Sequence, residues 1–375
     1  MMHAFTMKTI LQVKLQPSSE QKTTLLATIE RFNAACNYIS AIAFEQKCFS
    51  KFTLHKIAYY DVKEKFNLSA QVVVRAIGKA IDSYKLNKKV QHYFCKHGAM
   101  VYDQRIMSFK GVNKVSLWTL EGRQLIPMVY GEYQKARWHQ RKGQADLVYK
   151  DNKLYLLISV ETEKQQPIEP DGFLGVDLGI SEIASTSDGD SFSGKQIDIC
   201  RERFQTLRTN LQKCGSKSAK RHLKKIRNKE ANFRRHTNHC IAKKIVKKAK
   251  RSRCAIVLED LKGIRKRMKA RKSNKSRMHG WSFYQLRSFI EYKAELAGIP
   301  VHTINPAYTS QRCSKCGYTH KSNRKKQAEF VCQSCGFADN ADHNASKNIA
   351  LLGVINHRIV GAEITKELTF NCAIA

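Results

Sequence analysis

The sequence has few acidic residues for its length. Only 31 of its 375 residues are Asp or Glu, against 67 Lys or Arg, so the formal net charge is +36. An imbalance of this size is typical of a protein that binds a polyanion. The excess is concentrated between residues 201 and 277, where 29 Lys or Arg accompany four acids. A solvated basic helix face is one interpretation, but leucines and isoleucines recur through the segment, which favours a channel for a polyanion.

Disulfide patterning and long apolar runs are also absent. Eight of the twelve cysteines are scattered along the chain, which indicates a reducing compartment and not a disulfide framework. No apolar run approaches the length that crosses a bilayer, and the N-terminus does not have the apolar core of a signal peptide. We therefore expect a soluble, cytoplasmic protein with no membrane partner, long enough for two domains and a minor module.

The N-terminal half changes its hydrophobic period once. Ser18 and Gln21 form a capping box for a helix with apolar residues at helical spacing. Alternation replaces this spacing over 101–160, where turn signals at 121–122 and 151–152 mark hairpins. This order predicts a strand, a group of helices and then a small antiparallel β-barrel or sheet. The expected elements are a strand at 7–15 and helices after residue 18, at 54–66 and at 69–86.

The C-terminal half mixes strands with helices and follows a polar, proline-containing linker at 164–170. Two apolar strands are followed by long basic helices up to about residue 250, further strands and a helix come after them, and a last helix starts at Asp342, which indicates an α/β domain. A basic low-complexity stretch at 265–277 is expected to form a loop. The expected strands lie at 173–176, 183–187, 254–258 and 301–304, with a helix at 282–297.

Three carboxylates stand where apolar elements end or begin. Asp177 and Glu259 each end an apolar strand, and Asp342 starts the last helix, where helix capping is the alternative role. Carboxylates delivered in this way can converge on two divalent ions about 3.5–4 Å apart, which activate water for phosphodiester hydrolysis. Any one of the three has a structural explanation, but together they predict a catalytic site for Mg²⁺ or Mn²⁺.

Three other acids receive lesser roles. Asp188 lies in a Ser-Asp-Gly turn, and the turn itself explains it. Asp260 should point away from Glu259 if the strand continues through it. Asp339 lies three residues before Asp342 and is a candidate accessory ligand.

Four cysteines have the spacing of a zinc ribbon. Two Cys-x-x-Cys pairs are separated by fifteen residues, and a glycine follows the second cysteine of each pair. Four thiolates without a histidine at ligand spacing predict one closed, structural Zn²⁺ site. Basic residues between the pairs, including Arg324, suggest that the ribbon also touches phosphate. The predicted zinc ligands are Cys313, Cys316, Cys332 and Cys335.

These residues together resemble a known family, TnpB, the nuclease encoded by insertion sequences. The resemblance extends over 173–352 with order and spacing preserved, whereas the N-terminal half matches only in general layout. One position departs from the family, because Ser346 stands where a second alanine is usual. The motifs that carry the resemblance are GVDLGI (Gly175–Ile180), VLEDL (Val257–Leu261), PAYTSQRCSKCG (Pro306–Gly317) and DHNA (Asp342–Ala345).

The resemblance implies an α+β multidomain fold. Residues 1–168 would form a β-barrel wedge domain (about 1–16 and 98–163) with a helical recognition lobe inserted at about 17–97. Residues 169–375 would form a RuvC-like, RNase-H-type nuclease domain that includes basic helices at 196–250 and the zinc ribbon at 309–339. Asp177, Glu259 and Asp342 would be its catalytic, Mg²⁺-binding trio.

The resemblance further implies an RNA-guided DNA endonuclease of a transposable element, acting in a prokaryotic cytoplasm near the nucleoid. Its partners would be a guide RNA from the transposon end and double-stranded target DNA with a short flanking motif, with one protein monomer per guide. An unguided transposase or resolvase, a guided binder that does not cut, and a miniature type V CRISPR effector are the alternatives. The residues expected to contact nucleic acid are Arg221, Lys224, Lys225, Arg227, Arg234, Arg235, Lys243 and Lys247.

Overall fold

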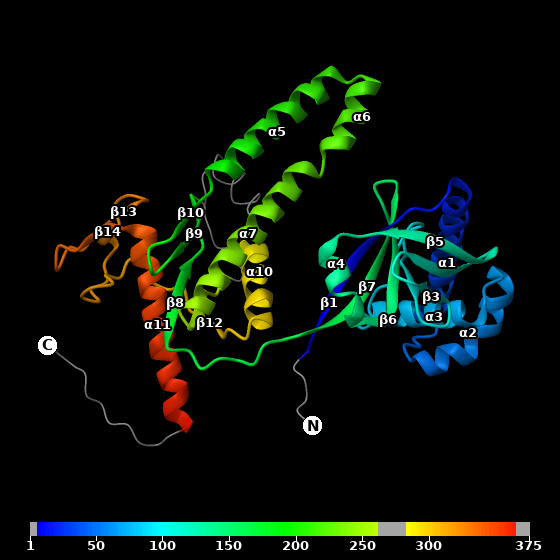
Figure 1. The fold of residues 1–375 in the computed structure, drawn as a ribbon, viewed down its shortest axis with the longest axis horizontal. Coiled ribbons are helices and arrows are strands. Elements are labelled where there is room, and N and C mark those ends of the chain that lie inside the picture. The colour runs from blue at the N-terminus through cyan, green and yellow to red at the C-terminus, as the bar shows by residue number, and fades with distance from the viewer. Residues whose placement is uncertain (1–5, 180, 262–282, 365–375) are drawn as a thin grey trace. The chain divides into compact units, whose positions relative to one another are not determined.

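The computed structural model describes residues 6–179, 181–261 and 283–364, with side chains as far as residue 356. The chain forms two compact units, each described here by itself (Figure 1). The N-terminal unit is Thr6–Glu163, and the C-terminal unit is built from Lys164 onward. The basic loop expected at 265–277 lies outside the described residues. Within the described ranges, no helix is long and apolar enough to cross a membrane.

Three helices of the N-terminal unit pack on one another: α1 (Ser19–Glu45), α2 (Lys51–Phe66) and α3 (Ala70–Tyr84). The predicted capping box is present, since Ser18 Oγ accepts from the Gln21 N–H and the Gln21 side chain accepts from the Ser18 N–H. The apolar stripe of α3 is buried against its neighbours. These stripes therefore stabilise helix packing, as amphipathic helices usually do.

The rest of the N-terminal unit is an antiparallel sheet in the order β2-β6-β7-β1-β5-β4-β3. β1 comes first in the sequence but pairs with β7 on one side and β5 on the other. The β6–β7 hairpin turns at Asp151 and Asn152, whose positive φ angles fit the predicted tight turn. The strands are β1 (Thr6–Leu15), β2 (Met100–Tyr102), β3 (Met107–Lys110), β4 (Lys114–Thr119), β5 (Gly122–Val129), β6 (Arg141–Lys150) and β7 (Lys153–Glu163), with α4 (Glu132–Ala136) and η1 (Trp138–Gln140) between β5 and β6.

The C-terminal unit contains a five-stranded sheet in the order β10-β9-β8-β11-β12. β8, β11 and the edge strand β12 run parallel to one another. β9 pairs antiparallel with both β8 and β10. All four strands expected here are present, and a short fifth, β10, joins them. Their bounds are β8 (Gly172–Asp177), β9 (Glu182–Thr186), β10 (Ser191–Ser193), β11 (Cys254–Glu259) and β12 (Val301–Ile304).

Helices cover both faces of this sheet. Because side chains alternate along a strand, Leu174 and Leu258 pack with α7 (Lys229–Arg251) and α10 (Phe283–Leu296) in one apolar cluster. Phe173 and Val257 face the opposite side and pack with Ile349 of α11 (Ala341–Ile364). Strands covered by helices on both faces explain the continuous apolar runs of the sequence and give the mixed α/β fold that it predicted.

An arm of two basic helices, α5 (Lys195–Cys214) and α6 (Lys217–Ile226), connects β10 to α7 and extends away from the sheet (Figure 1). α5 has no buried residue. Seven of the eight basic residues predicted to contact nucleic acid are exposed on α6, α7 and their junction. Arg234 differs, because it is partly buried and lies within 4.0 Å of Glu230.

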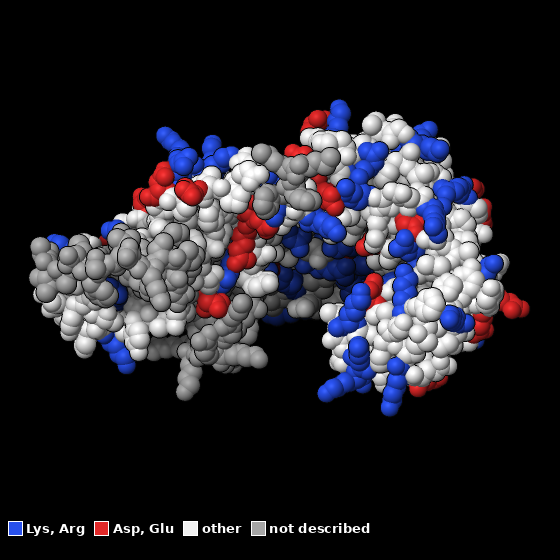
Figure 2. All heavy atoms as spheres, turned by 90° about the horizontal axis from the view of Figure 1, so that it is seen from below, with Lys and Arg blue, Asp and Glu red and all other residues white. Residues whose placement is uncertain are grey.

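The N-terminal unit also presents basic side chains. On the face that Figure 2 shows, blue Lys and Arg side chains are spread over this unit, with red Asp and Glu side chains between them.

Candidate active site

Two of the three predicted carboxylates end neighbouring parallel strands. β8 and β11 pair in register, with Val176 opposite Leu258, so Asp177 and Glu259 follow at the same edge of the sheet. Carboxyl ends of parallel strands lie side by side, which is why such an edge collects functional groups. Both acids are partly buried.

The third carboxylate reaches the same edge on α11. This helix approaches β8 so closely that a Cβ added at Gly175 would lie 2.1 Å from the Ser346 carbonyl oxygen. A larger residue at position 175 would therefore push α11 away. Oδ2 of Asp342 faces Gly179, where an added Cβ would lie 3.8 Å from it. Gly175 thus makes room for the helix that carries Asp342, whereas Gly179 makes room for the Glu182 carbonyl oxygen, 2.6 Å from an added Cβ.

Helix capping does not explain Asp342. The first helical residue is Ala341, and Asn340 Oδ1 accepts hydrogen bonds from the backbone N–H groups of Asp342 and His343 at 2.9 and 3.2 Å. Asn340 therefore occupies the capping position, and the structural alternative considered for Asp342 is wrong. The carboxylate of Asp342 instead accepts a hydrogen bond from Arg324 at 2.9 Å.

The charges of Glu259 and Asp342 act on Asp177. Burial, followed by the charges of Glu259 and Asp342, raises the pKa of Asp177 to about 8, and Arg324 opposes the shift. Burial also raises the pKa of Glu259, against a hydrogen bond from Thr309 that lowers it. Negative groups held together in this way are stabilised by a cation. Hard carboxylate oxygens fit Mg²⁺ or Mn²⁺.

A pH-dependent stability follows from the raised pKa of Asp177. The folded protein keeps a proton that the unfolded chain releases near the ordinary pKa of 3.8, so this contribution to stability is complete below that pH and is lost as the pH rises toward 8. In metal-free buffer, the Asp177→Asn variant should melt a few degrees above the unaltered protein at pH 8, and at the same temperature near pH 4. Thermal unfolding followed by circular dichroism measures both; an equal difference at the two pH values would contradict the coupling.

Thr309 contacts Glu259 directly. Its hydroxyl donates a hydrogen bond to Glu259 Oε1 at 2.5 Å, and its side chain is buried. The Thr309 carbonyl accepts from Asn348 of α11 at 3.0 Å, and Asn348 is itself fully buried. The segment that precedes the cysteines is thereby bonded both to the strand that carries Glu259 and to the helix that carries Asp342.

The four cysteines come together as a metal site. Their ligand atoms all lie within 4.8 Å of one another, with Cys313–Cys335 at 3.8 Å and Cys316–Cys332 at 3.6 Å between sulfurs. Tetrahedral Zn²⁺ with Zn–S bonds of about 2.3 Å places its sulfurs about 3.8 Å apart. The geometry therefore suits one zinc ion. In the described ranges, no other group of His, Cys, Asp or Glu has its ligand atoms as close together. The three carboxylates are also less tightly grouped than the cysteines.

The cysteine segment forms a ribbon that is bonded to α11. It contains η2 (Lys321–Asn323) and a two-stranded sheet of β13 (Glu329–Val331) and β14 (Ala338–Asn340). Buried Asn344 accepts from the Ser314 N–H and donates to the Arg312 carbonyl, at 2.9 and 2.8 Å. Zinc ligands and Asp342 are therefore parts of one hydrogen-bonded assembly.

The other acids considered from the sequence have partners outside the trio. Asp188 accepts from Thr186 within its turn and pairs with Lys248 at 2.7 Å. Asp260 lies 3.3 Å from an Arg287 nitrogen. Asp339, the candidate accessory ligand, pairs with His343 and Lys347 on α11.

Sequence reasoning did not identify three residues at the site: Thr309, Arg287, and Arg324 in its contact with Asp342. Thr309 and Arg324 lie 50 and 18 positions from the carboxylates that they bond. The only available signal was the presence of both residues in the ribbon segment. For Arg287, the available signal was the acid Glu291, which follows four positions later on the same helix. This spacing permits the 2.7 Å ion pair that is observed.

Comparison with solved structures shows the class of fold. A cryo-EM structure titled Cas12f1-sgRNA-target DNA complex superposes with a TM-score of 0.62 at 13% sequence identity, over 92% of this chain and 99% of that chain. At this identity the likeness shows the fold alone. The mixed α/β fold of this chain is therefore similar to the fold of the Cas12f1 protein in that complex.

Sequence comparison shows which proteins this chain resembles. Residues 157–265 match the family described as Probable transposase, and residues 283–349 match the Cas12f1-like TNB domain. The chain is 33% identical to the CRISPR-associated endodeoxyribonuclease Cas12f1 of Sulfoacidibacillus thermotolerans, over 59% of this chain and 54% of that protein. It is 32% identical to the putative RNA-guided DNA endonuclease InsQ of Escherichia coli K12, over 54% of each.

Other relatives are named TnpB-like proteins, so the predicted resemblance to the TnpB family is confirmed, and the chain also resembles the Cas12f proteins. The chain spans about half the length of these curated relatives. Both family matches fall in and around the C-terminal unit, which contains the carboxylates and the cysteines.

Proposed function

We propose that this protein is an RNA-guided DNA endonuclease that cuts phosphodiester bonds at a single metal-dependent site. The observation that carries the proposal is the meeting of Asp177, Glu259 and Asp342 at one edge of the sheet, where burial and mutual repulsion raise the pKa of Asp177. The names of the relatives, an endodeoxyribonuclease and an RNA-guided DNA endonuclease, support the same activity.

In this proposal the three carboxylates hold divalent metal ions, Mg²⁺ or Mn²⁺. When bound, such ions supply an activated water and stabilise the leaving oxygen in phosphodiester hydrolysis. Thr309 fixes the orientation of Glu259 through its 2.5 Å hydrogen bond. Arg324 keeps Oδ1 of Asp342 in place, so that Oδ2 faces the end of β8. The chain's own contribution is thus to place three oxygen ligands before the substrate arrives.

We assign to the two units of the chain the domain roles that the family resemblance implies. The C-terminal unit would be the RuvC-like nuclease domain with its structural Zn²⁺ ribbon, and the N-terminal unit a wedge with a helical recognition lobe. The exposed basic residues of α6 and α7 would contact the backbones of guide RNA and target DNA, while base pairing selects the sequence. One monomer would act with each guide, in the cytoplasm of a prokaryotic cell.

The proposal is tested with the purified complex. RNA that copurifies with the expressed protein is sequenced, and DNA carrying a matching target is then incubated with the complex and Mg²⁺. We expect a guide RNA that ends in sequence foreign to the transposable element. We also expect double-strand cleavage of the matching DNA only. Cleavage by RNA-free protein would instead indicate an unguided transposase or resolvase, and guided binding without any cleavage would indicate a binding protein.

The Thr309→Val variant should cut more slowly while keeping its fold, because valine preserves the shape of threonine but cannot donate to Glu259. Loss of a hydrogen bond to a charged group predicts a fall in the single-turnover cleavage rate on the order of tenfold or more. The Thr309→Ser variant keeps the hydroxyl and should cut at close to the unaltered rate. A valine variant as fast as the unaltered protein, or a serine variant as slow as the valine variant, would remove Thr309 from the site.

A further inference from the structure

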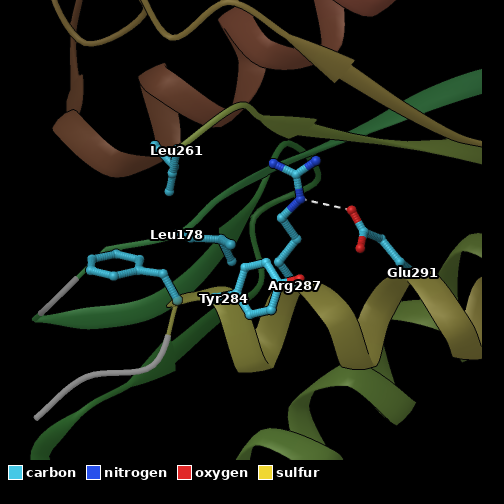
Figure 3. Close-up of a pocket in the computed structure, with 6 residues that line it drawn as sticks. Leu178, Leu261, Tyr284, Arg287 and Glu291 are labelled. Carbon is cyan, nitrogen blue, oxygen red and sulfur yellow. Dashed lines mark hydrogen bonds and ion pairs between the residues drawn. The ribbon is translucent and has the colours of Figure 1, made fainter. Parts of the chain in front are cut away.

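A small cavity lies beside the two strand ends that carry Asp177 and Glu259. Its volume is about 240 Å³. Leu178, the residue after Asp177, and Leu261, two residues after Glu259, form one side, and the first turns of α10 form the other (Figure 3). Tyr284, Arg287 and Glu291 lie on one face of α10, and Phe283 completes the lining.

Arg287 connects the cavity wall to β11, the strand that ends at Glu259. Its guanidinium donates to the Glu259 carbonyl oxygen at 3.1 Å and to the Thr303 hydroxyl of β12 at 3.2 Å. It also pairs with Glu291 at 2.7 Å, as the dashed line in Figure 3 shows. The cavity wall and the catalytic edge of the sheet therefore hold a fixed position relative to each other.

The cavity suits an uncharged ring better than a phosphate. Among the described residues that line it, the cation is Arg287, which is paired with Glu291 and also lies 3.3 Å from Asp260, so these residues leave little positive charge for an anion. The other lining side chains are aliphatic or aromatic. The cavity is smaller than the roughly 300–1,000 Å³ typical of sites for drug-sized ligands, and this favours a single planar group.

Tyr284 supplies a surface on which such a group can stack. Its side chain is 77% exposed even though it lines the cavity. Exposed aromatic rings are a usual platform for unpaired bases, because every base has a π face. In a chain with a net charge of +36, the partner with planar, uncharged groups on an anionic backbone is a nucleic acid strand.

We propose that this cavity binds one unpaired nucleobase of the DNA strand that is being cut, with Tyr284 stacking on it and Leu178 and Leu261 contacting its edge. A base held there would fix the neighbouring phosphate at the carboxylates, which is a gain in positioning at the reacting atoms. The inference rests on the proposed function, and it adds a substrate subsite to that function.

An abasic scan of the target DNA tests the subsite. Each position within a few nucleotides of the cut is replaced in turn by an abasic residue, and single-turnover cleavage rates are measured for the guided complex. The unaltered protein should lose about tenfold in rate at one position and little at the others. The positions without an effect serve as internal controls for duplex destabilisation.

The variant Tyr284→Ala should be slower on intact DNA by a similar factor and should show no further loss at the sensitive position. Tyr284→Phe keeps the ring and should behave as the unaltered protein does. A Tyr284→Ala complex that still loses tenfold at that position, or a scan without a sensitive position, would overturn the subsite while leaving the nuclease assignment intact. Absence of guided cleavage by the unaltered protein would overturn the proposed function, and the subsite with it.

Discussion

Replacing Asp177 with alanine should abolish guided DNA cleavage without unfolding the protein. Asp177 ends β8, and burial, followed by the charges of Glu259 and Asp342, raises its pKa to about 8. Alanine removes a proposed metal ligand and leaves the strand pairing of β8 unchanged. We expect the single-turnover rate with Mg²⁺ to fall by on the order of 10³-fold or more. The Glu259→Gln and Asp342→Asn variants should show the same loss.

Asp188→Ala is the matched control. Asp188 belongs to the same sheet, in the turn after β9, but its partners are Thr186 and Lys248. Its loss should leave the cleavage rate close to that of the unaltered complex. Guide-RNA binding, measured by gel shift, should be equal in all of these proteins. An Asp177→Ala complex that binds its guide and still cuts at the rate of the Asp188→Ala complex would show that the site lies elsewhere.

Mn²⁺ binding measured by electron paramagnetic resonance gives a second readout, independent of cleavage. The three site variants should bind fewer ions than Asp188→Ala does.

The acids of the candidate site could be selected from the sequence because they stand at the ends or starts of regular elements. Apolar runs that finish at Asp177 and Glu259 predicted two buried strands, and the parallel pairing of β8 with β11 then places both acids at one edge. Asp342 was the least certain of the three, since a helix start has its own use for an aspartate. The structure excludes that alternative, because Asn340 is the residue that caps the helix.

Contacts between distant segments could not be predicted in the same way. The bond from Thr309 to Glu259 depends on how the ribbon folds back over the sheet, and neither residue's neighbours encode it. The place of β1 between β5 and β7 has the same cause, because local periodicity specifies a strand but not its partners. The cavity at Tyr284 arises only when α10 packs beside the strand ends.

Replacing Cys332 and Cys335 together with serine should also abolish cleavage, although neither cysteine belongs to the trio. Four sulfurs within 4.8 Å suit one zinc ion in a closed site, and a structural zinc site contributes directly to the stability of its module. Without the ion, the ribbon loses the fold that holds Thr309 on Glu259 and Arg324 on Asp342, at 2.5 and 2.9 Å. Two of the three carboxylates would therefore lose their fixed orientation at once.

The measurement pairs zinc content, by elemental mass spectrometry, with the single-turnover cleavage rate. The double-serine protein should contain no zinc and cut at least about 10²-fold more slowly, whereas Cys240→Ser, at an exposed cysteine of α7, should keep both zinc and activity. Guide binding should persist in both proteins, because the exposed basic residues of α6 and α7 lie outside the ribbon. A zinc-free double-serine protein that cuts at the unaltered rate would show that the sheet and α11 position the carboxylates without the ribbon. The expected result would instead make the zinc module a part of the nuclease site, acting through the hydroxyl of Thr309 and the guanidinium of Arg324.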